Sequence, residues 1–239
     1  MRIINAVSNS LANSSVTFKI LIAVLFATLT SDFTFAKGDT LKIGHKRFSI
    51  EPSTKAEFEK IPSFKFDTSE KKNLARDSRD VKRNGDTLFF KLGKGKFATL
   101  VNNYTDGEPY AKYFYEKTLK DINCYYITGA PWEGDMNVLI NKTTGDTTWL
   151  AGEPIISPNK KLIICAGYSD SGEALQGFEL YEINNNKISI IGELNSQYLP
   201  NWAPQAARWF DDTTLLVERR IELNTAREPK LEYIRMSMK

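Results

Sequence analysis

The chain has 239 residues, of which 26% are charged and 41% are hydrophobic, and its formal net charge is +3. Lys and Arg are interleaved with Asp and Glu, so the sequence lacks the clustered basic face that nucleic-acid binding requires. The most basic stretch, residues 71–83, is interrupted by Asp77 and Asp80, as is typical of a solvated face or a linker. This charge distribution excludes a nucleic-acid partner.

The first 36 residues have the pattern of a secretory signal peptide. Arg2 and Lys19 precede an apolar run over residues 20–29, and the small-x-small sequence at residues 34–36 is a cleavage signal. The apolar run is about half the roughly 20 residues that a membrane span needs, so we expect no membrane span in the mature chain. We predict cleavage after Ala36 and a periplasmic or secreted location.

Residues 37–83 are predicted to form a polar N-terminal arm. Ser53 and Thr68 are suitable N-cap residues, and each is followed by an acid in the first turn of a candidate helix. Pro62 limits the first of these helices to about two turns, because proline cannot continue a helix interior. We therefore expect an arm with short helices that either docks on the following domain, which its phenylalanines favour, or remains partly disordered.

Residues 84–239 are predicted to form a β-repeat domain. Short apolar runs alternate with turn residues such as Gly85 and Gly93, whose backbone tolerates the positive φ of tight strand connections. The large number of such runs indicates an all-β fold. The predicted strands are residues 86–92, 96–101, 111–116, 123–128, 136–141, 147–150, 154–157, 161–165, 178–183, 187–191, 207–210, 214–220 and 231–236.

An internal repeat indicates how these strands are organised. Residues 137–150 are echoed 41 positions later by residues 178–191, and each copy reads as strand, polar turn, strand. Four-stranded propeller blades repeat at about 40 to 45 residues, and the domain holds just under four such units. We therefore predict a small β-propeller-like ring, with or without the arm, or an open array of about four antiparallel sheets. The alternative is a twisted two-sheet sandwich in which the echo is coincidental.

The two cysteines follow the same spacing. Cys124 and Cys165 are also 41 residues apart and both lie in short apolar runs. A disulfide needs Cα atoms within about 7 Å, whereas equivalent positions in neighbouring units are usually farther apart than paired strands. The spacing therefore favours two separate buried thiols, even in an oxidising compartment.

Residues 152–163, GEPIISPNKKLI, resemble the "SPDGK" strand-turn-strand of WD-repeat-like β-propeller domains in bacteria. Together with residues 132–135 upstream and 201–212 downstream, they make the chain resemble a group of uncharacterised secreted bacterial proteins with this β-repeat layout. The resemblance covers about residues 84–220. It implies a fold and a secreted location, and it implies no activity.

Catalytic and metal chemistry has few residues to draw on. His45 is the only histidine and lies in the arm, so histidine-dependent nucleophilic catalysis and a histidine-based zinc site are not expected. Oxygen ligands for calcium exist at residues 170–173 and 211–212, but neither follows the DxDxDG spacing, and such residues usually close turns. We therefore predict no metal, no cofactor and no catalytic residue.

Polar and aromatic residues between the predicted strands are the candidate partner-binding residues, because repeat folds often present binding groups on loops. For the two tryptophans of this set, packing over the end of their own sheet is the alternative, whereas Trp149 and Trp209 lie within strand patterns and are expected to pack. The candidates are Trp132, Glu133, Asp135, Tyr168, Tyr198 and Trp202.

Three functions follow from these observations. The first is a non-catalytic binding module for a protein or cell-envelope partner, with Trp132 and Trp202 exposed on one rim. The second is a glycoside hydrolase of envelope saccharide that uses two converging carboxylates. The third is a structural envelope component whose arm contacts a neighbouring chain and nothing in its own. The acids considered for the hydrolase are Glu133, Asp135, Glu173 and Asp212.

Overall fold

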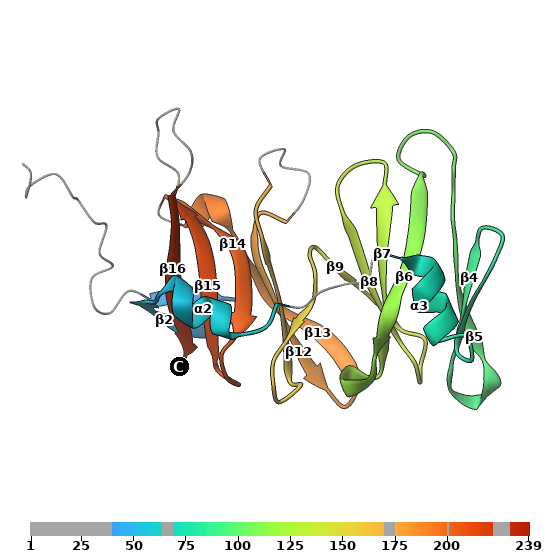
Figure 1. Cartoon of the computed structure of the whole chain (residues 1–239), viewed down its shortest axis with the longest axis horizontal. Helices are drawn as coiled ribbons and strands as arrows, with labels where there is room; N and C mark the ends of the chain where they lie inside the picture. Colours follow the sequence, from blue (N-terminus) through green and yellow to red (C-terminus); the bar gives the residue numbers. More distant parts are fainter. Residues whose placement is uncertain (1–39, 64–68, 170–174, 200, 222–229) are drawn as a thin grey trace, which may run out of the picture. The chain divides into compact units, whose positions relative to one another are not determined.

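The computed structural model describes residues 40–63, 69–169, 175–199, 201–221 and 230–239. The described residues form four antiparallel sheets and two short α-helices, with strands predominating (Figure 1). The predicted all-β fold of about four antiparallel sheets is therefore confirmed, and four sheets exclude the two-sheet sandwich. The predicted signal peptide lies outside the described residues. None of the described helices has the length and apolar character needed to cross a membrane.

The sheets are numbered I to IV in the order in which the chain enters them after helix α3 (Glu70–Arg76); sheet IV also contains the two strands that precede the helices. Sheet I is β3 (Val81–Asn84), β4 (Thr87–Lys91) and β5 (Phe97–Val101). Sheet II is β6 (Ala111–Leu119), β7 (Cys124–Pro131), β8 (Met136–Asn141) and β9 (Thr147–Leu150). Sheet III is β10 (Ile155–Ile156), β11 (Leu162–Gly167), β12 (Gly177–Asn184) and β13 (Lys187–Asn195). Sheet IV is β14 (Trp202–Trp209), β15 (Thr214–Ile221), β16 (Lys230–Met238), β2 (Lys46–Pro52) and β1 (Thr40–Ile43), in that spatial order.

The repeat seen in the sequence corresponds to equivalent parts of neighbouring sheets. Sheets II and III are both simple antiparallel meanders, and the echoed hairpins, β8–β9 and β12–β13, are the third and fourth strands of each. Cys124 lies on the second strand of sheet II and Cys165 on the second strand of sheet III. Both thiols are buried and free, which confirms the prediction for the cysteines, and burial raises the pKa of Cys124 to about 12.

Side chains on both faces of sheets II and III are buried against neighbouring sheets. On β7, Tyr125 and Ile127 join a cluster with sheet I, whereas Cys124 and Tyr126 join a cluster with sheet III. Between sheets III and IV the Phe178 ring meets the Trp202 ring edge-to-face, with centroids 6.2 Å apart. Burial on both faces explains why the strands of the middle sheets read as nearly continuous apolar runs.

The first part of the predicted arm is a β-hairpin and not a polar connector. Strand β2 pairs antiparallel with β16, so residues from both ends of the described chain share sheet IV. Leu41, Ile43, Phe48 and Ile50 are buried while the residues between them are more exposed. Because apolar residues alternate with charged and polar ones in this hairpin, it contains no continuous apolar run. The sequence was therefore interpreted as a polar arm and not as strands.

The two predicted helices are present. Helix α2 (Lys55–Lys60) has Thr54 as its N-cap, one residue after the predicted cap, and helix α3 (Glu70–Arg76) has Ser69. Phe58 of α2 is buried against sheet IV, and Arg208 of β14 lies over its ring at 4.1 Å and donates to its backbone carbonyl at 2.9 Å. The arm therefore docks on its own chain, and the expectation attached to a structural component, that it contacts nothing there, is wrong.

Three 3₁₀ turns complete the described secondary structure. They are η1 (Gly93–Gly95), η2 (Lys120–Ile122) and η3 (Ser196–Tyr198). The turn between β1 and β2 matters more for packing, because Gly44 there has φ +57° and lies against the backbone of Ile191 and Gly192 on β13. A Cβ at residue 44 would overlap the carbonyl of Ile191, so the hairpin can approach sheet III this closely only with glycine at its tip.

Gly44→Ala should therefore destabilise the protein much more than Gly85→Ala. Both glycines have φ +57°, but a Cβ at Gly85 has no heavy atom within 4 Å. We expect G85A to lower the free energy of unfolding by about 1 kcal/mol, from backbone strain alone. For G44A we expect a loss of about 2–5 kcal/mol, because overpacking against β13 adds to that strain. Urea unfolding of both variants measures the difference, and equal losses would show that the hairpin does not pack on β13.

Candidate functional site

A cavity of about 1040 Å³ lies among sheets II, III and IV. Its walls include parts of β6, β10 and β14, which are the first strands of these three sheets, and the residues that follow α2. The polar side chains on its walls include Lys117, Thr128, Asp135, Glu153, Tyr168 and Arg208. An opening of this size at the junction of several sheets is the natural place to look for a binding site.

A β-bulge on β6 shapes one wall of the cavity. The pairing with β7 runs from Tyr115↔Ile127 directly to Lys117↔Tyr126, so the ladder skips Glu116. Neighbouring residues of a regular strand point to opposite faces, and a bulge breaks that alternation. Here Glu116 Oε1 accepts a hydrogen bond from Thr128 Oγ1 at 2.7 Å, and both Thr128 and Lys117 line the cavity. The bulge thus brings a carboxylate and an ammonium group, adjacent in sequence, to the same side of the strand.

Helix α3 holds the bulged strand in place from outside the sheet. Glu70 Oε1 accepts from the backbone N–H of Tyr115 at 2.8 Å, and Asn73 Nδ2 donates to the Tyr115 carbonyl at 3.3 Å. Arg76 Nη2 donates to the Glu116 carbonyl at 3.0 Å. These three residues are spaced by three and so lie along one face of the helix. Because β6 is an edge strand of sheet II, the helix satisfies backbone groups that a further strand would otherwise pair.

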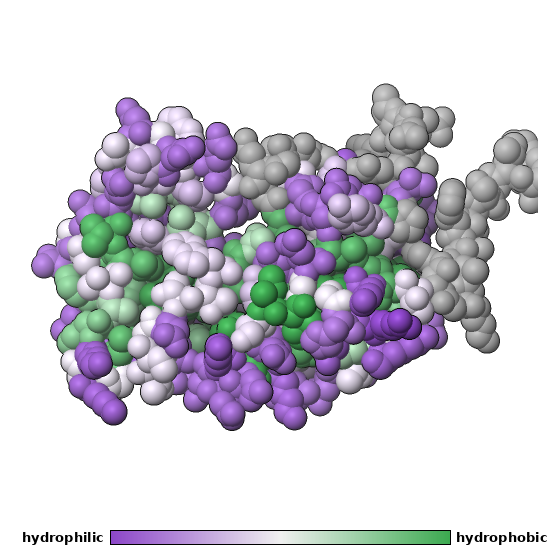
Figure 2. All heavy atoms as spheres, turned by 180° about the vertical axis from the view of Figure 1, so that it is seen from behind, coloured by the Kyte–Doolittle hydropathy of each residue, from purple (hydrophilic) through white to green (hydrophobic). Residues whose placement is uncertain are grey.

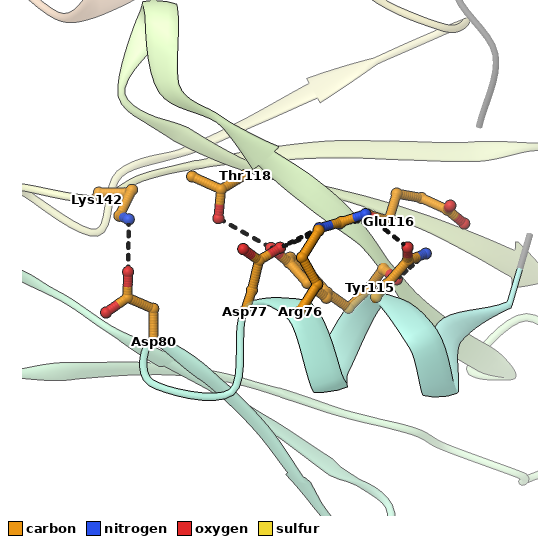
Figure 3. Close-up of polar contacts among 8 residues, drawn as sticks. Arg76, Asp77, Asp80, Tyr115, Glu116, Thr118 and Lys142 are labelled. Atoms are coloured by element: carbon orange, nitrogen blue, oxygen red, sulfur yellow. Dashed lines mark hydrogen bonds and ion pairs between the residues drawn. The ribbon is translucent and has the colours of Figure 1, made fainter. Parts of the chain in front are cut away.

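The turn after α3 adds a second set of contacts, shown in Figure 3. The buried Tyr115 hydroxyl donates to Asp77 Oδ2 at 2.7 Å and lies 2.9 Å from Thr118 Oγ1. Lys142 Nζ donates to Asp80 Oδ2 at 2.9 Å, which connects the same turn to sheet II. Burial raises the pKa of Tyr115, so its hydroxyl keeps its proton and remains a donor. The bulge is therefore fixed on both of its sides.

The charged groups of the cavity perturb one another. Desolvation, with the charge of Arg76, lowers the pKa of Lys117 to about 8, although Glu116 and Glu153 oppose the shift. Desolvation raises the pKa of Glu153, and the carboxylates of Glu116 and Asp135 raise it further. This part of the wall therefore places three acidic side chains, Glu116, Asp135 and Glu153, around Lys117.

The structure brings some of the predicted binding residues to the cavity. Asp135 and Tyr168 line it. Trp132, 55% exposed, and Glu133, also exposed, belong to the β7–β8 loop that ends with Asp135. Trp132 follows β7 and Tyr168 follows β11, and each of these strands is the second of its sheet. The two loops therefore leave neighbouring sheets at equivalent ends. Tyr198 is exposed on η3, outside the cavity wall.

The tryptophans correct two expectations and confirm one. Trp202 is only 3% exposed, so the prediction that it lies on a rim with Trp132 is wrong: it begins strand β14 and packs on Phe178. Trp149 is 53% exposed and does not pack as predicted, because β9 is an edge strand. Trp209 is buried as predicted, and its Nε1 donates to the Ile155 carbonyl at 2.9 Å.

The acids proposed for glycoside hydrolysis do not converge as a group. Of the four, only Asp135 lines the cavity; Glu133 is exposed in its loop and Glu173 lies outside the described residues. Asp212 is exposed between β14 and β15. The other carboxylates on the wall are Asp121 and Glu153, and Glu116 joins them through its hydrogen bond with Thr128; sequence reasoning missed all three. Glu116 ends a predicted strand, and nothing in the sequence indicates the bulge that turns it toward Thr128.

Metal binding finds no support among the described residues. No group of three His, Cys, Asp or Glu side chains in these ranges is arranged to hold a metal ion. The Asp211 carboxylate instead closes its turn, because Oδ1 accepts from the backbone N–H groups of Thr213 and Thr214 at 2.8 Å each. The other calcium candidate, residues 170–173, lies outside the described residues.

No protein-family model and no curated protein sequence matches this chain. The function must therefore be argued from the cavity and from the residues that line it.

The pKa of Lys117 gives the protein a testable pH dependence. An unfolded chain titrates this lysine near its usual 10.5 and the folded protein near 8. Between these values the unfolded state binds a proton that the folded state has lost, so this group makes the free energy of unfolding rise with pH. We expect the unfolding free energy of wild type minus that of Lys117→Met to increase between pH 7 and pH 10. Urea unfolding at several pH values measures it.

If the curves for Lys117→Met and wild type remain parallel, Lys117 is not desolvated in the cavity.

Proposed function

We propose that this chain is an exported, non-catalytic binding module that holds a segment of a protein or cell-envelope partner in the cavity among sheets II, III and IV. The observation that carries the proposal is the cavity of about 1040 Å³ with a charged wall built on a bulge. Ligand sites usually have about 300–1,000 Å³, so this cavity can take several residues of a peptide or an oligosaccharide. Export rests on the sequence pattern of residues 1–36.

The chemistry of the wall suggests what the partner presents. Asp135, Glu153 and Glu116 form an acidic cluster around Lys117 in one part of the wall, whereas Lys120, Lys160 and Arg208 line other parts of the cavity. A primary amine or a guanidinium group complements the acidic cluster, and it gains most where the carboxylates are partly desolvated. The ring of Tyr168 also lines the cavity, and the Arg220 guanidinium lies 5.4 Å from its centroid. The partner segment we propose is therefore cationic.

We also propose that the four sheets are arranged like the blades of a small propeller. Two observations support this arrangement. The first strands of three of the four sheets, β6, β10 and β14, contribute to the wall of one cavity, as innermost strands do around a central channel, and no residue of sheet I lines it. Strand β2 from the beginning of the described chain completes the sheet of β16 at its end, as in the closure of a ring. In this arrangement the cavity is the central channel.

A carboxylate-dependent hydrolase is the second candidate, and one observation favours it. The pKa of Glu153 is raised by desolvation and by the neighbouring carboxylates of Glu116 and Asp135. A raised pKa on one acid beside ionised acids is how glycoside hydrolases separate a proton donor from a nucleophile or base. The binding module stays the first proposal because Lys117 shares the wall and has no part in that mechanism.

Titration with short peptides of opposite charge tests the proposed function. We expect trilysine to bind and triglutamate not to bind, as measured by calorimetry at pH 7 and low salt. Glu153→Gln and Asp135→Asn should each weaken trilysine binding by about fivefold to tenfold, as expected for the loss of about 1 kcal/mol or more of charged contact. Asp212→Asn removes an exposed acid outside the cavity wall and should leave binding unchanged.

Two results would contradict the proposal. Equal weakening by Asp212→Asn would mean that general charge attracts the peptide, and binding of neither peptide would remove the cationic partner. If the protein instead released reducing ends from peptidoglycan saccharides, and Glu153→Gln abolished that release, the hydrolase would replace the binding module.

A further inference from the structure

Sheet I has three strands, whereas sheets II and III have four and sheet IV has five. Its last strand, β5, pairs with β4 on one side, and no described strand pairs with it on the other. In sheets II and III a fourth strand occupies the equivalent place. The outer edge of β5 therefore has the position where this fold elsewhere adds another strand.

The sequence of β5 does nothing to protect that edge. Proteins usually guard exposed edge strands with lysine, proline or a bulge. The five residues of β5, Phe97–Val101, contain no charge and no proline, and their pairing with β4 is regular. By contrast, helix α3 covers the edge of β6 with side-chain hydrogen bonds. Among the described residues, the outer edge of β5 is unpaired from Phe97 to Val101, and beyond it Asn103 pairs with Ala111, the first residue of β6.

The exposed side chains of β5 are apolar as well. Phe97 is 62% exposed and Val101 56%, and the exposed Thr99 lies between them on the same face of the strand. Phe89 of β4 pairs with Thr99 and continues this face. In Figure 2, hydrophobic residues (green) reach the surface on the left-hand side, the side of sheet I in that view. Two large apolar side chains on one unpaired edge mark a contact surface.

The hydrogen-bonding groups of β5 point the right way for a further strand. Asn102 N donates to the Asp86 carbonyl and Leu92 N to the Lys96 carbonyl, both at 2.8 Å, so the even-numbered residues of this segment bond to β4. In an antiparallel ladder, the alternate residues then direct their N–H and C=O groups to the other side. These residues are Phe97, Thr99 and Val101. Their backbone groups and their exposed side chains together form a complete strand-pairing surface.

This surface is complementary to itself. If two β5 strands pair antiparallel about Thr99, Phe97 lies opposite Val101 of the second copy, and Thr99 lies opposite its own counterpart. Aromatic–β-branched pairs and Thr–Thr pairs are both favourable across strands. A symmetric contact of this kind closes with two copies and cannot propagate.

The charges that flank β5 favour the same orientation. Lys94 and Lys96 precede the strand, whereas Asp86 and Asp106 lie near its far end, and all four are exposed. Antiparallel pairing of two copies places the lysine end of one beside the aspartate end of the other. Parallel pairing would place the lysines together. Such complementarity steers association and fixes its register.

We propose that a second copy of this chain is the partner of β5, so that two copies associate through an antiparallel β5–β5 contact centred on Thr99. The contact joins the two copies of sheet I into one continuous sheet across a two-fold axis. It leaves the cavity of each copy unobstructed, because β5 contributes no residue to the cavity wall. Two binding sites on one dimer would raise the avidity for a partner with repeated segments.

Analytical ultracentrifugation of the full chain, purified after expression with its own N-terminal segment, tests the proposal. We expect a reversible dimer, and Thr99→Lys should weaken it at least tenfold because two lysines then face each other across the axis. Trp149→Lys is the matched control: it introduces the same charge at an exposed position of another edge strand, β9, and should leave the dimer unchanged.

Cysteine cross-linking gives a second readout that does not depend on affinity. Under mild oxidation Thr99→Cys should form a disulfide-linked dimer, and Thr147→Cys on β9 should not. Circular dichroism establishes that each variant is folded. A wild-type protein that stays monomeric while Thr99→Cys fails to cross-link overturns the proposal. So does a dimer that Trp149→Lys disrupts and Thr99→Lys does not.

Discussion

Burial of sheet faces against one another is the constraint on which the rest of this structure depends. Sheets II and III carry apolar side chains on both faces, so neither can be stable in water without a neighbour on each side. Tyr125 and Tyr126 are adjacent on β7 but belong to different hydrophobic clusters, which shows that both faces of sheet II are buried. At sheet IV the docked Phe58 of helix α2 supplies the cover. At sheet I the exposed Phe97 and Val101 have no cover within the described chain, which is why a second copy fits there.

The cavity and its charges follow from the same packing. Where sheets II, III and IV meet, their first strands leave space that apolar side chains do not fill. The bulge at Glu116 directs polar groups to that space, and α3 stabilises the bulge through Glu70, Asn73 and Arg76. Helix α3, which lies in the predicted arm, therefore helps to determine which charges the cavity presents. The sequence did not reveal this role because α3 and β6 are far apart along the chain.

Most strands could be predicted from the sequence, because strands buried on both faces consist of continuous apolar runs between turn residues. All thirteen predicted runs overlap an observed strand, and the cysteines are buried and free as the repeat predicted. The strands β1, β2 and β3, which lie in the predicted arm, were not predicted because only one face of each is buried. Glu116 escaped because a bulge depends on partners from α3 that local pattern cannot reveal. Trp149 was predicted to be buried and is exposed, whereas Trp202 was predicted to be exposed and is buried. The exposure of a tryptophan depends on whether its strand lies at the edge of a sheet, which only the assembled sheets determine.

Neighbouring sheets in this structure pack through equivalent faces of a repeated unit. Nuclear Overhauser contacts in methyl-labelled protein test this packing most directly at Ile163 of sheet III. Its methyl groups should show contacts to the sheet II members of the shared cluster, Tyr126, Leu139 and Leu150. They should show none to Val138 and Ile140, which face sheet I from the same strand as Leu139. Contacts from Ile163 to Val138 or Ile140, or no contact with sheet II, would contradict the stacking of the sheets and everything inferred from it.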